Sequence, residues 1–314
     1  MHNVLSTSGI LWATCALTGG DGYFSGTDLS TGEEVFSVNL GPMITPEGFA
    51  VNKNNTTAWI ADSYNDQIII VDLLTQAVTG TVTTLEEGGA VITPFQVALS
   101  PDETRLYVTG DTAKILEVID TLNNIRLKGV ELPGFARGVT VSPDGKTVYV
   151  ALYSTDQIGF IDIATSSVTD TLFIGRLPME IIISKEGTTL YVANQYGNSI
   201  AALDTATKEI VHIMLDDSPR AIALSASELY LYVGTQSSGV YTVDLTSADV
   251  ISSVQLSYPC SSVGVSPDDA SVYGMAYEAD GPQPTPVDVM DSPTTTITGT
   301  LYINGIGRYM QVTA

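Results

Sequence analysis

Three of the six arginines share one spacing in the sequence. Arg137, Arg220 and Arg308 each stand five residues before a serine or threonine. A guanidinium presents its N–H donors in a planar fork that fits a carboxylate, phosphate or sulfate. The three side chains could therefore hold an anionic ligand if the fold brings them together. A structural role, in which each arginine donates to backbone carbonyls of a neighbouring repeat, is the alternative.

Three acidic residues could act as a catalytic base if the fold brings them close to these arginines. If the chain is an enzyme of the lactonase, lyase or cyclase type, the arginines would hold an anionic substrate and a nearby acid would act as the base. The candidates for that base are Glu47, Glu180 and Asp62.

Tyrosines in short polar segments suggest a binding surface. Such side chains could stack on a sugar or a small planar ligand, or contact a protein, while packing between repeats is the alternative. The four candidates are Tyr64, Tyr153, Tyr196 and Tyr277.

These residues lie within a repeat whose regular period is 41 or 42 residues. Each unit has an alternating apolar run, a turn resembling Ser-Pro-Asp-Gly, an aromatic residue, a β-branched run and an Asp. The serine of the turn, or its substitute, falls at Asn52, Ser100, Ser142, Ser184, Ser225, Ser266 and Thr313. Units of this length with four short strands are typical of propeller blades, which cannot bury their faces without neighbours.

The two ends of the chain each contain part of one repeat. Gly307–Ala314 matches the first strand of a unit, and Ser8–Leu40 supplies the other three. We therefore predict an all-β, seven-bladed β-propeller of four antiparallel strands per blade, closed by a C-terminal inner strand that joins three N-terminal strands. The even spacing of the repeats predicts a single domain over 1–314.

The repeats resemble a known family. Segments such as SPDETRLYVTG, SPDGKTVYVAL and SKEGTTLYVANQYGNSIAALDTATKEIV resemble the YVTN-type repeats of surface-layer-like and other extracytoplasmic β-propellers. The resemblance covers nearly the whole chain. Similar repeats occur in proteins that bind partners and in propellers that resemble lactonases, so the resemblance implies architecture and compartment and assigns no chemistry.

The strand order predicts which face of the propeller carries function. Turns between strands one and two, and between strands three and four, emerge on one face, which we call the turn face. Its recurring Asp residues, such as Asp144 and Asp162, are typical of turn structure. The opposite face, which we call the loop face, carries irregular connections and the candidate residues above, so we expect function there.

Composition limits the partners. The net charge is -23, with only 12 Lys plus Arg, which opposes binding to nucleic acid or anionic lipid. No apolar run is long enough to span a membrane. Met1 and His2 lead directly into repeat material, so we expect either a secreted or cell-surface protein without its signal peptide, which we favour, or a cytoplasmic one. We expect a monomer.

Cysteine and histidine usage narrows the chemistry further. Repeat alignment puts Cys15 and Cys260 on the same face of adjacent blades, where they are candidates for a disulfide, with two free buried thiols as the alternative. His2 lies at the chain end and His212 in an expected outer strand, so we expect neither a histidine zinc site nor a Ser-His-Asp triad. No cofactor is expected, although oxygen ligands for calcium could come from Asp21, Asp62, Asp66 and Asp111.

Three functions agree with these observations. The favoured one is a non-enzymatic extracytoplasmic propeller that binds a protein, a glycan or a small anionic ligand on the loop face at the mouth of the channel. The second is the enzyme described above. The third is a purely structural repeat of a larger surface protein.

Overall fold

The computed structural model describes residues 9–17, 20–84, 92–237, 239–276 and 284–313. Regular structure in these ranges consists of β-strands and one short 3-10 helix, η1, Gln195–Gly197. The strands form seven antiparallel sheets, each of which is one blade. The chain is thus an all-β, seven-bladed propeller, as its repeats predict. In the described ranges, no helix has the length and apolar character needed to cross a membrane.

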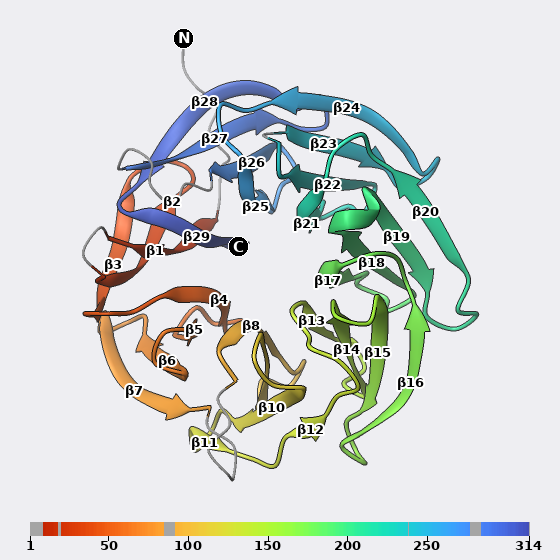
Figure 1. Cartoon of the computed structure of the whole chain (residues 1–314). Helices are drawn as coiled ribbons and strands as arrows, with labels where there is room; N and C mark the ends of the chain where they lie inside the picture. The colour runs from red at the N-terminus through yellow and green to blue at the C-terminus, as the bar shows by residue number, and fades with distance from the viewer. Residues whose placement is uncertain (1–8, 18–19, 85–91, 238, 277–283, 314) are drawn as a thin grey trace. The chain divides into compact units, whose positions relative to one another are not determined.

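One blade is built from both ends of the chain, and this confirms the predicted split repeat. Its strand order is β29-β1-β2-β3, so the C-terminal strand pairs with three N-terminal ones. Figure 1 shows β29, in blue, beside β1, in red. The register joins Ile10 to Thr313 and Ala16 to Ile306. The indole Nε1 of Trp12 also donates to Thr313 Oγ1 at 3.0 Å.

The blades fall into two compact units. The first comprises Met1–Pro42 with Ile213–Ala314, and the second comprises Met43–His212. One boundary lies between β3 and β4, and the other passes through an outer strand, β20. The single domain over 1–314 stays a prediction.

The first unit contains the shared blade and two further blades. The strands of the shared blade are β1 Ile10–Ala16, β2 Gly22–Asp28, β3 Glu34–Gly41 and β29 Ile306–Thr313. The next blade has β21 Pro219–Leu224, β22 Tyr230–Thr235, β23 Gly239–Asp244 and β24 Asp249–Gln255. The third has β25 Cys260–Val265, β26 Ser271–Ala276, β27 Thr285–Asp291 and β28 Thr296–Ile303.

The second unit contains four blades in chain order. They begin with β4 Pro46–Val51, β5 Thr57–Asp62, β6 Gln67–Asp72 and β7 Ala77–Thr83. The next has β8 Pro94–Leu99, β9 Arg105–Gly110, β10 Ile115–Asp120, and a split outer strand, β11 Ile125–Arg126 and β12 Val130–Glu131, both parts of which pair with β10. Then come β13 Val139–Val141, β14 Thr147–Leu152, β15 Gln157–Asp162 and β16 Ser167–Phe173. The last has β17 Pro178–Ile183, β18 Thr189–Asn194, β19 Ser199–Asp204 and β20 Ile210–Met214.

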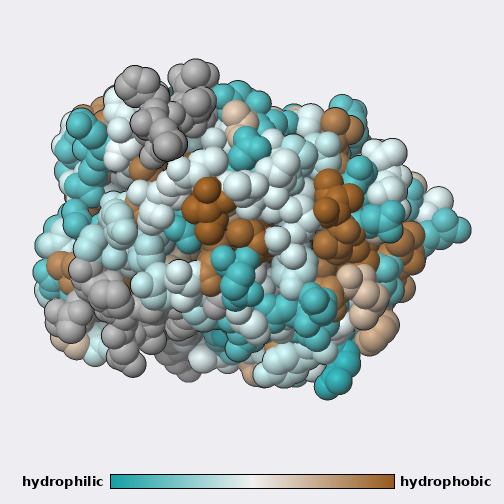
Figure 2. Space-filling view, turned by 90° about the horizontal axis from the view of Figure 1, so that it is seen from above, coloured by the Kyte–Doolittle hydropathy of each residue, from teal (hydrophilic) through white to brown (hydrophobic). Residues whose placement is uncertain are grey.

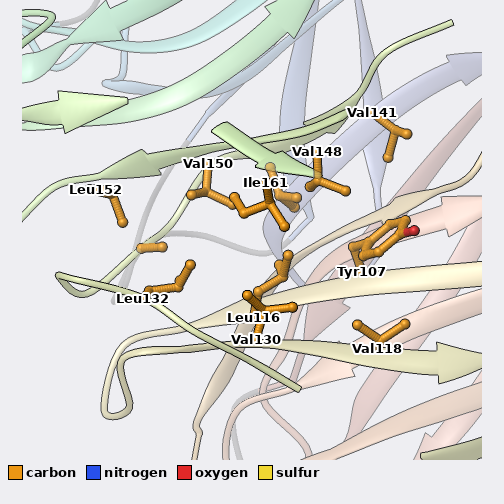
Figure 3. Close-up of a cluster of buried hydrophobic side chains, with 12 residues drawn as sticks. Tyr107, Leu116, Val118, Val130, Leu132, Val141, Val148, Val150, Leu152 and Ile161 are labelled. Carbon is orange, nitrogen blue, oxygen red and sulfur yellow. The ribbon is translucent and has the colours of Figure 1, made fainter. Parts of the chain in front are cut away.

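The apolar core lies between neighbouring blades. One cluster joins Leu116 and Val118 of β10 to Val148 and Val150 of β14, and Figure 3 shows these side chains meeting. Both faces of the middle strands of a blade are therefore apolar, which explains why β6, β10 and β15 read as nearly continuous apolar runs. Burial of these faces is the main favourable contribution to folding.

Regular hydrogen bonds organise the turn face, as the recurring Ser and Asp residues predict. The Ser142 hydroxyl donates to Asp144 Oδ1 at 2.7 Å and accepts from the backbone N–H groups of Lys146 and Thr147. Asp162 accepts from the N–H and hydroxyl of Thr165, and these bonds lower the pKa of its carboxyl. These acids are structural elements of the turns.

The outer strands leave some apolar side chains in solvent. The exposed examples include Phe173 on β16 and Tyr302 on β28. In the view of Figure 2, hydrophobic residues form separate brown patches among hydrophilic ones. Scattered exposure of this kind is normal for a protein surface.

The turn chemistry can be tested at Ser142. We expect Ser142→Ala to lower the free energy of unfolding by about 1–3 kcal/mol, because the Thr147 N–H loses its acceptor and the Lys146 N–H keeps only Asp144 Oδ1. Urea denaturation with an unchanged m-value measures this effect. The control is Ser247→Ala, since Ser247 is exposed and hydrogen-bonds Asp244 through its backbone. Equal stability of the two variants would contradict the structural role of the hydroxyl.

Candidate functional site

Arg137 makes a forked ion pair with Asp111 on the loop face. Asp111 directly follows β9, and Arg137 lies just before β13 of the next blade. The guanidinium Nε is 2.8 Å from Asp111 Oδ1, and Nη2 is 2.7 Å from Oδ2. About a quarter of each side chain is exposed. The donors that could have held an anionic ligand are thus directed at a carboxylate of the protein.

Aromatic rings surround this ion pair. The Arg137 Cζ lies 4.3 Å from the centre of the Phe95 ring and 5.6 Å from that of Tyr153. The Tyr153 ring stacks on Phe135 at 6.3 Å, and its hydroxyl donates to the Asp111 carbonyl at 3.3 Å. We call Phe95, Asp111, Phe135, Arg137 and Tyr153 the arginine–aromatic cluster. Its members are all half-buried, so each presents an edge or face to solvent.

A lysine extends the cluster outward. The Lys114 ammonium lies 5.6 Å from the centre of the Phe135 ring, and the lysine is exposed. Burial, and secondarily the Asp111 charge, raise the pKa of Tyr153, so its hydroxyl stays protonated and continues to donate at neutral pH. The cluster is a polar and aromatic surface held in one arrangement by charge and stacking.

Sequence reasoning identified only part of this cluster. It selected Arg137 and Tyr153, and considered Asp111 only as a calcium ligand. A signal for Phe95 exists, because Phe95 stands five residues before Ser100 as Arg137 stands before Ser142. Equivalent positions of consecutive blades are neighbours, so their stacking could have been inferred. Nothing in the repeat pattern indicates Phe135.

The other two arginines belong to the first compact unit. Arg220 is half-buried on β21, and Arg308 is half-buried on β29. Within this unit β25 contacts both β21 and β29. The Arg308 Nε is buried, with no hydrogen-bond acceptor among the residues that the structure describes. The three-arginine site stays a prediction.

Asp62 is a structural acid at the end of β5. Its side chain is fully buried and accepts four hydrogen bonds. The Oδ1 atom receives the backbone N–H groups of Thr45 and Tyr64, and Oδ2 receives the amides of Asn65 and Gln67. A carboxylate so fully occupied holds the loop between β5 and β6 in place.

Buried polar side chains stand at the equivalent strand ends of other blades. The Asn194 side-chain amide donates to the Ile174 carbonyl, and the Thr235 hydroxyl bonds both backbone groups of Gly239.

Of the other candidate bases, Glu47 accepts a hydrogen bond of 3.4 Å from Ser63 Oγ, and Glu180 is half-buried on β17.

The remaining tyrosines are dispersed. Tyr64 is 55% exposed after β5, and Tyr196 is 64% exposed in η1. Tyr277 lies outside the described residues. Among the three described tyrosine candidates, Tyr153 alone contacts another sequence-predicted site residue through its side chain, whereas Tyr64 reaches Asp62 through its backbone N–H.

The four calcium candidates have different surroundings in the described ranges. No three His, Cys, Asp or Glu side chains gather there in a way that could hold a metal ion. Asp111 pairs with Arg137, and Asp62 is enclosed by donors. The carboxyl of Asp66 has a raised pKa because it is partly buried. Asp21 accepts a 3.4 Å hydrogen bond from the Asn39 amide.

The two cysteines of the candidate disulfide are not bonded in the structure, which has the alternative arrangement of two buried thiols. Cys15 and Cys260 are both free and buried. Cys15 packs in a cluster with Leu11 and Met310, whereas Cys260 packs in another with Tyr232. Burial raises the pKa of the Cys15 thiol to about 12, so at neutral pH this residue is a small apolar side chain.

The role of Asp62 can be tested by Asp62→Asn. We expect the free energy of unfolding to fall by about 1–3 kcal/mol, because an amide nitrogen on either side would face two donors without an acceptor. Chemical denaturation measures this, with the exposed Asp249→Asn as control. A stable variant that has lost a catalytic activity would instead indicate a base.

The thiols can be tested with a chromogenic disulfide reagent and no reductant. We expect both cysteines to react slowly in the native protein and both to titrate rapidly in denaturant, because burial shields both thiols from the reagent and keeps Cys15 protonated. Absence of titratable thiols in the denatured chain would restore the disulfide.

Solved structures resemble the fold. Kuenenia stuttgartiensis hydrazine synthase is 19% identical, with 89% of this chain and 95% of that chain covered and a TM-score of 0.74. A functionally unknown protein from Desulfotomaculum acetoxidans is 16% identical, with 98% of each chain covered and a TM-score of 0.78. U3-55K is 12% identical, with 86% of each chain covered and a TM-score of 0.73. These likenesses concern the fold alone.

One family model matches the sequence. The model described as "Lactonase, 7-bladed beta-propeller" matches residues 97–209 and 163–253, which together make up half of the chain. No curated protein matches the sequence of this chain. The YVTN-type character of the repeats stays a prediction. The matched segment extends from β8 to β24, and the blade number of the family agrees with the seven sheets of the structure. The chain therefore belongs to the lactonase family of seven-bladed β-propellers.

Proposed function

We propose that this chain is a non-enzymatic, extracytoplasmic binding module whose loop face contacts a protein partner through the arginine–aromatic cluster. The observation that carries this proposal is the stacking of Phe95 and Tyr153 on Arg137, which Asp111 holds in a forked ion pair. Aromatic residues and arginine are enriched at the centres of protein interfaces and among their energetic hot spots.

The rigidity of the cluster favours recognition. A side chain that is already held in place loses little freedom when a partner binds, so more of its contact energy becomes affinity. Arg137 is held by two hydrogen bonds and by rings on its face, and Tyr153 by its bond to the Asp111 carbonyl. The half-buried rings retain surface that a partner can cover.

Charge indicates the kind of partner. The Arg137 charge is balanced by Asp111, so a small anion would have to compete with a bidentate carboxylate of the protein itself. The whole chain carries a net charge of -23, which attracts basic partners and repels acidic ones. A protein with a basic or neutral contact surface therefore fits better than an anionic ligand.

The setting is part of the proposal. We infer a secreted or cell-surface monomer, supported by the scarcity of Lys and by the resemblance of the repeats to surface-layer-like propellers. The free buried thiols do not indicate the compartment of the protein, because they behave as apolar core residues in any compartment.

A lactonase-type enzyme is the second candidate, and the family match favours it. In that case Arg220 or Arg308 would hold an anionic substrate and Glu47 or Glu180 would act as the base. The buried Arg308 Nε without an acceptor is the observation in this chain that agrees best with such a site.

The binding proposal predicts that truncation of the cluster weakens partner binding. The full chain, immobilised, is offered the extracellular proteins of its source cells, and each recovered protein is titrated against purified variants. We expect Phe95→Ala and Phe135→Ala to weaken binding about 30-fold each, as loss of a 2 kcal/mol hot spot does. Tyr302→Ala, which removes an exposed ring from β28, should leave the dissociation constant unchanged.

Three results would contradict the proposal. The first is a partner whose affinity is equal for the wild type and both cluster variants. The second is capture of glycans in place of proteins through the cluster. The third is hydrolysis of lactones, followed as proton release at neutral pH, that disappears in Glu47→Gln or Glu180→Gln while the circular dichroism spectrum is unchanged. The last result would support the enzyme.

A further inference from the structure

A pocket opens on the turn face between two blades of the second unit. It has a volume of about 200 Å³ and lies between the turn after β8 and the turn after β13. Its lining includes Asp102 and Arg105 from one blade and Asp144 and Ile163 from the next. This is the face that the sequence indicates as purely structural.

The pocket exists because one bridging residue is missing. The third residue after the turn serine contacts the preceding blade in two other places. Glu103 accepts from the Lys53 backbone N–H at 2.6 Å, and Asp269 accepts from that of Ser227 at 2.7 Å. The equivalent residue beside the pocket is Gly145, which has no side chain to reach the preceding turn.

The backbones also lie further apart here than at the next blade. A Cβ placed on Gly145 would be 3.8 Å from Pro101 Cδ, whereas one placed on Gly187 would be 2.9 Å from Pro143 Cδ. The second pair of turns is therefore in close contact despite its glycine. Among the four turns compared, only that of Gly145 both lacks a bridging side chain and lies further from the turn of the preceding blade.

A buried hydroxyl without a partner lines this space. Tyr107 is 3% exposed, and its hydroxyl has no hydrogen-bond partner among the described residues. Figure 3 shows the Tyr107 oxygen at the end of the apolar cluster, pointing away from the other side chains. An unsatisfied buried hydroxyl costs free energy unless something binds it.

The repeats show what this hydroxyl lacks. The equivalent Trp59 donates to Asn124 of the next blade at 3.4 Å, and the Tyr232 hydroxyl bonds Ser292 of the next blade. Ser292 follows the Asp that ends β27, and the residue in that place beside Tyr107 is Ile163, which offers no polar side-chain atom. Burial raises the Tyr107 pKa, so the hydroxyl remains a donor.

The polar groups of the wall define the chemistry of a ligand. Arg105 is exposed, with no ion pair or side-chain hydrogen bond among the described residues. The donors that reach Asp102, from Ser100 and Thr104, all bind its Oδ1. The wall therefore offers donors from Arg105 and Tyr107 and an acceptor at Asp102 Oδ2.

We propose that this pocket binds a small neutral polyhydroxy compound of monosaccharide size. An anion would face the carboxylates of Asp102 and Asp144, and a cation would face Arg105, whereas a hydroxyl both donates and accepts. The rings of Pro101 and Pro143 offer apolar surface to the C–H faces of a sugar. A closed cavity of about 150 Å³ holds a benzene molecule, and this pocket of about 200 Å³ is open to solvent, so part of a sugar ring can enter it while the rest stays in water.

The proposal is tested by saturation-transfer NMR on the full chain, with glucose, galactose, mannose and glycerol as probes. We expect at least one sugar to bind with a dissociation constant of roughly 1 mM, as a ligand of about a dozen non-hydrogen atoms does. Thermal shift alone would mislead, because sugars excluded from the surface stabilise any protein.

Variants assign the binding to the pocket. Tyr107→Phe removes only the hydroxyl and should weaken binding at least tenfold without loss of stability, because that hydroxyl has no partner in the free protein. Gly145→Glu should close the pocket. Glu103 holds a positive φ of 59° at the equivalent place, so the backbone there accommodates Glu. Tyr273→Phe is the matched control, since the Tyr273 hydroxyl is also buried and unpartnered, and it should bind normally.

Other outcomes overturn the proposal. Failure of all four probes to bind would refute it, as would equal binding by Tyr107→Phe and the wild type. Stronger binding of inorganic phosphate or citrate than of any sugar would exclude a neutral ligand. Methyl glucoside, compared with free glucose, separates the end of a glycan from a free sugar, and binding of either supports the class.

Discussion

A four-stranded blade has two apolar faces and cannot bury them alone, and the rest of this structure depends on that constraint. The middle strands place apolar side chains on both sides of each sheet, so the core clusters of the described ranges each draw on two neighbouring blades. The pairing of β29 with β1 completes a blade from the two ends of the chain, and side chains of that blade, Leu11 and Met310, pack with those of β26 and β27. Without β29, the exposed edge of β1 and the face of β25 would lose their neighbour.

The same constraint divides residues that repeat from residues that vary. Side chains that hold each blade together must recur, which is why Ser100 and Ser142 make equivalent hydrogen bonds in their turns. A side chain whose contact occurs between only one pair of blades need not recur in the other blades. The pairing of Arg137 with Asp111, and the gap beside Gly145, are both of this second kind. Function in a repeat protein is most readily found where equivalent positions differ.

The sequence predicted the fold well because the fold is specified many times over. The alternation of apolar residues, the turn residues and the terminal split each indicate a propeller, and the structure has the seven four-stranded units that they predict. It predicted the site less well because a site depends on single contacts. The spacing that selected Arg137 gave no sign that Asp111 would neutralise it. Asp62 looked like a free acid on a loop, and only the structure shows donors on both of its oxygens.

The cysteines show a further limit. Repeat alignment correctly puts Cys15 and Cys260 in blades that adjoin in sequence order, but a disulfide needs two particular side chains to point at each other. Each thiol instead packs into its own core cluster, because in the interior of a blade a small apolar side chain is what the position requires.

A single comparison between blades accounts for what the sequence missed on the turn face. Glu103, Asp269 and Gly145 occupy one repeat position, and the first two reach the preceding turn while the third cannot. A glycine in a turn is usually explained by its positive φ, and Gly145 has one, at 70°. That explanation is insufficient here, since Glu103 and Asp269 adopt nearly the same φ without being glycine. The position therefore tolerates a side chain, and the absence of one leaves a space into which Tyr107 directs a hydroxyl that has no partner in the described part of the chain.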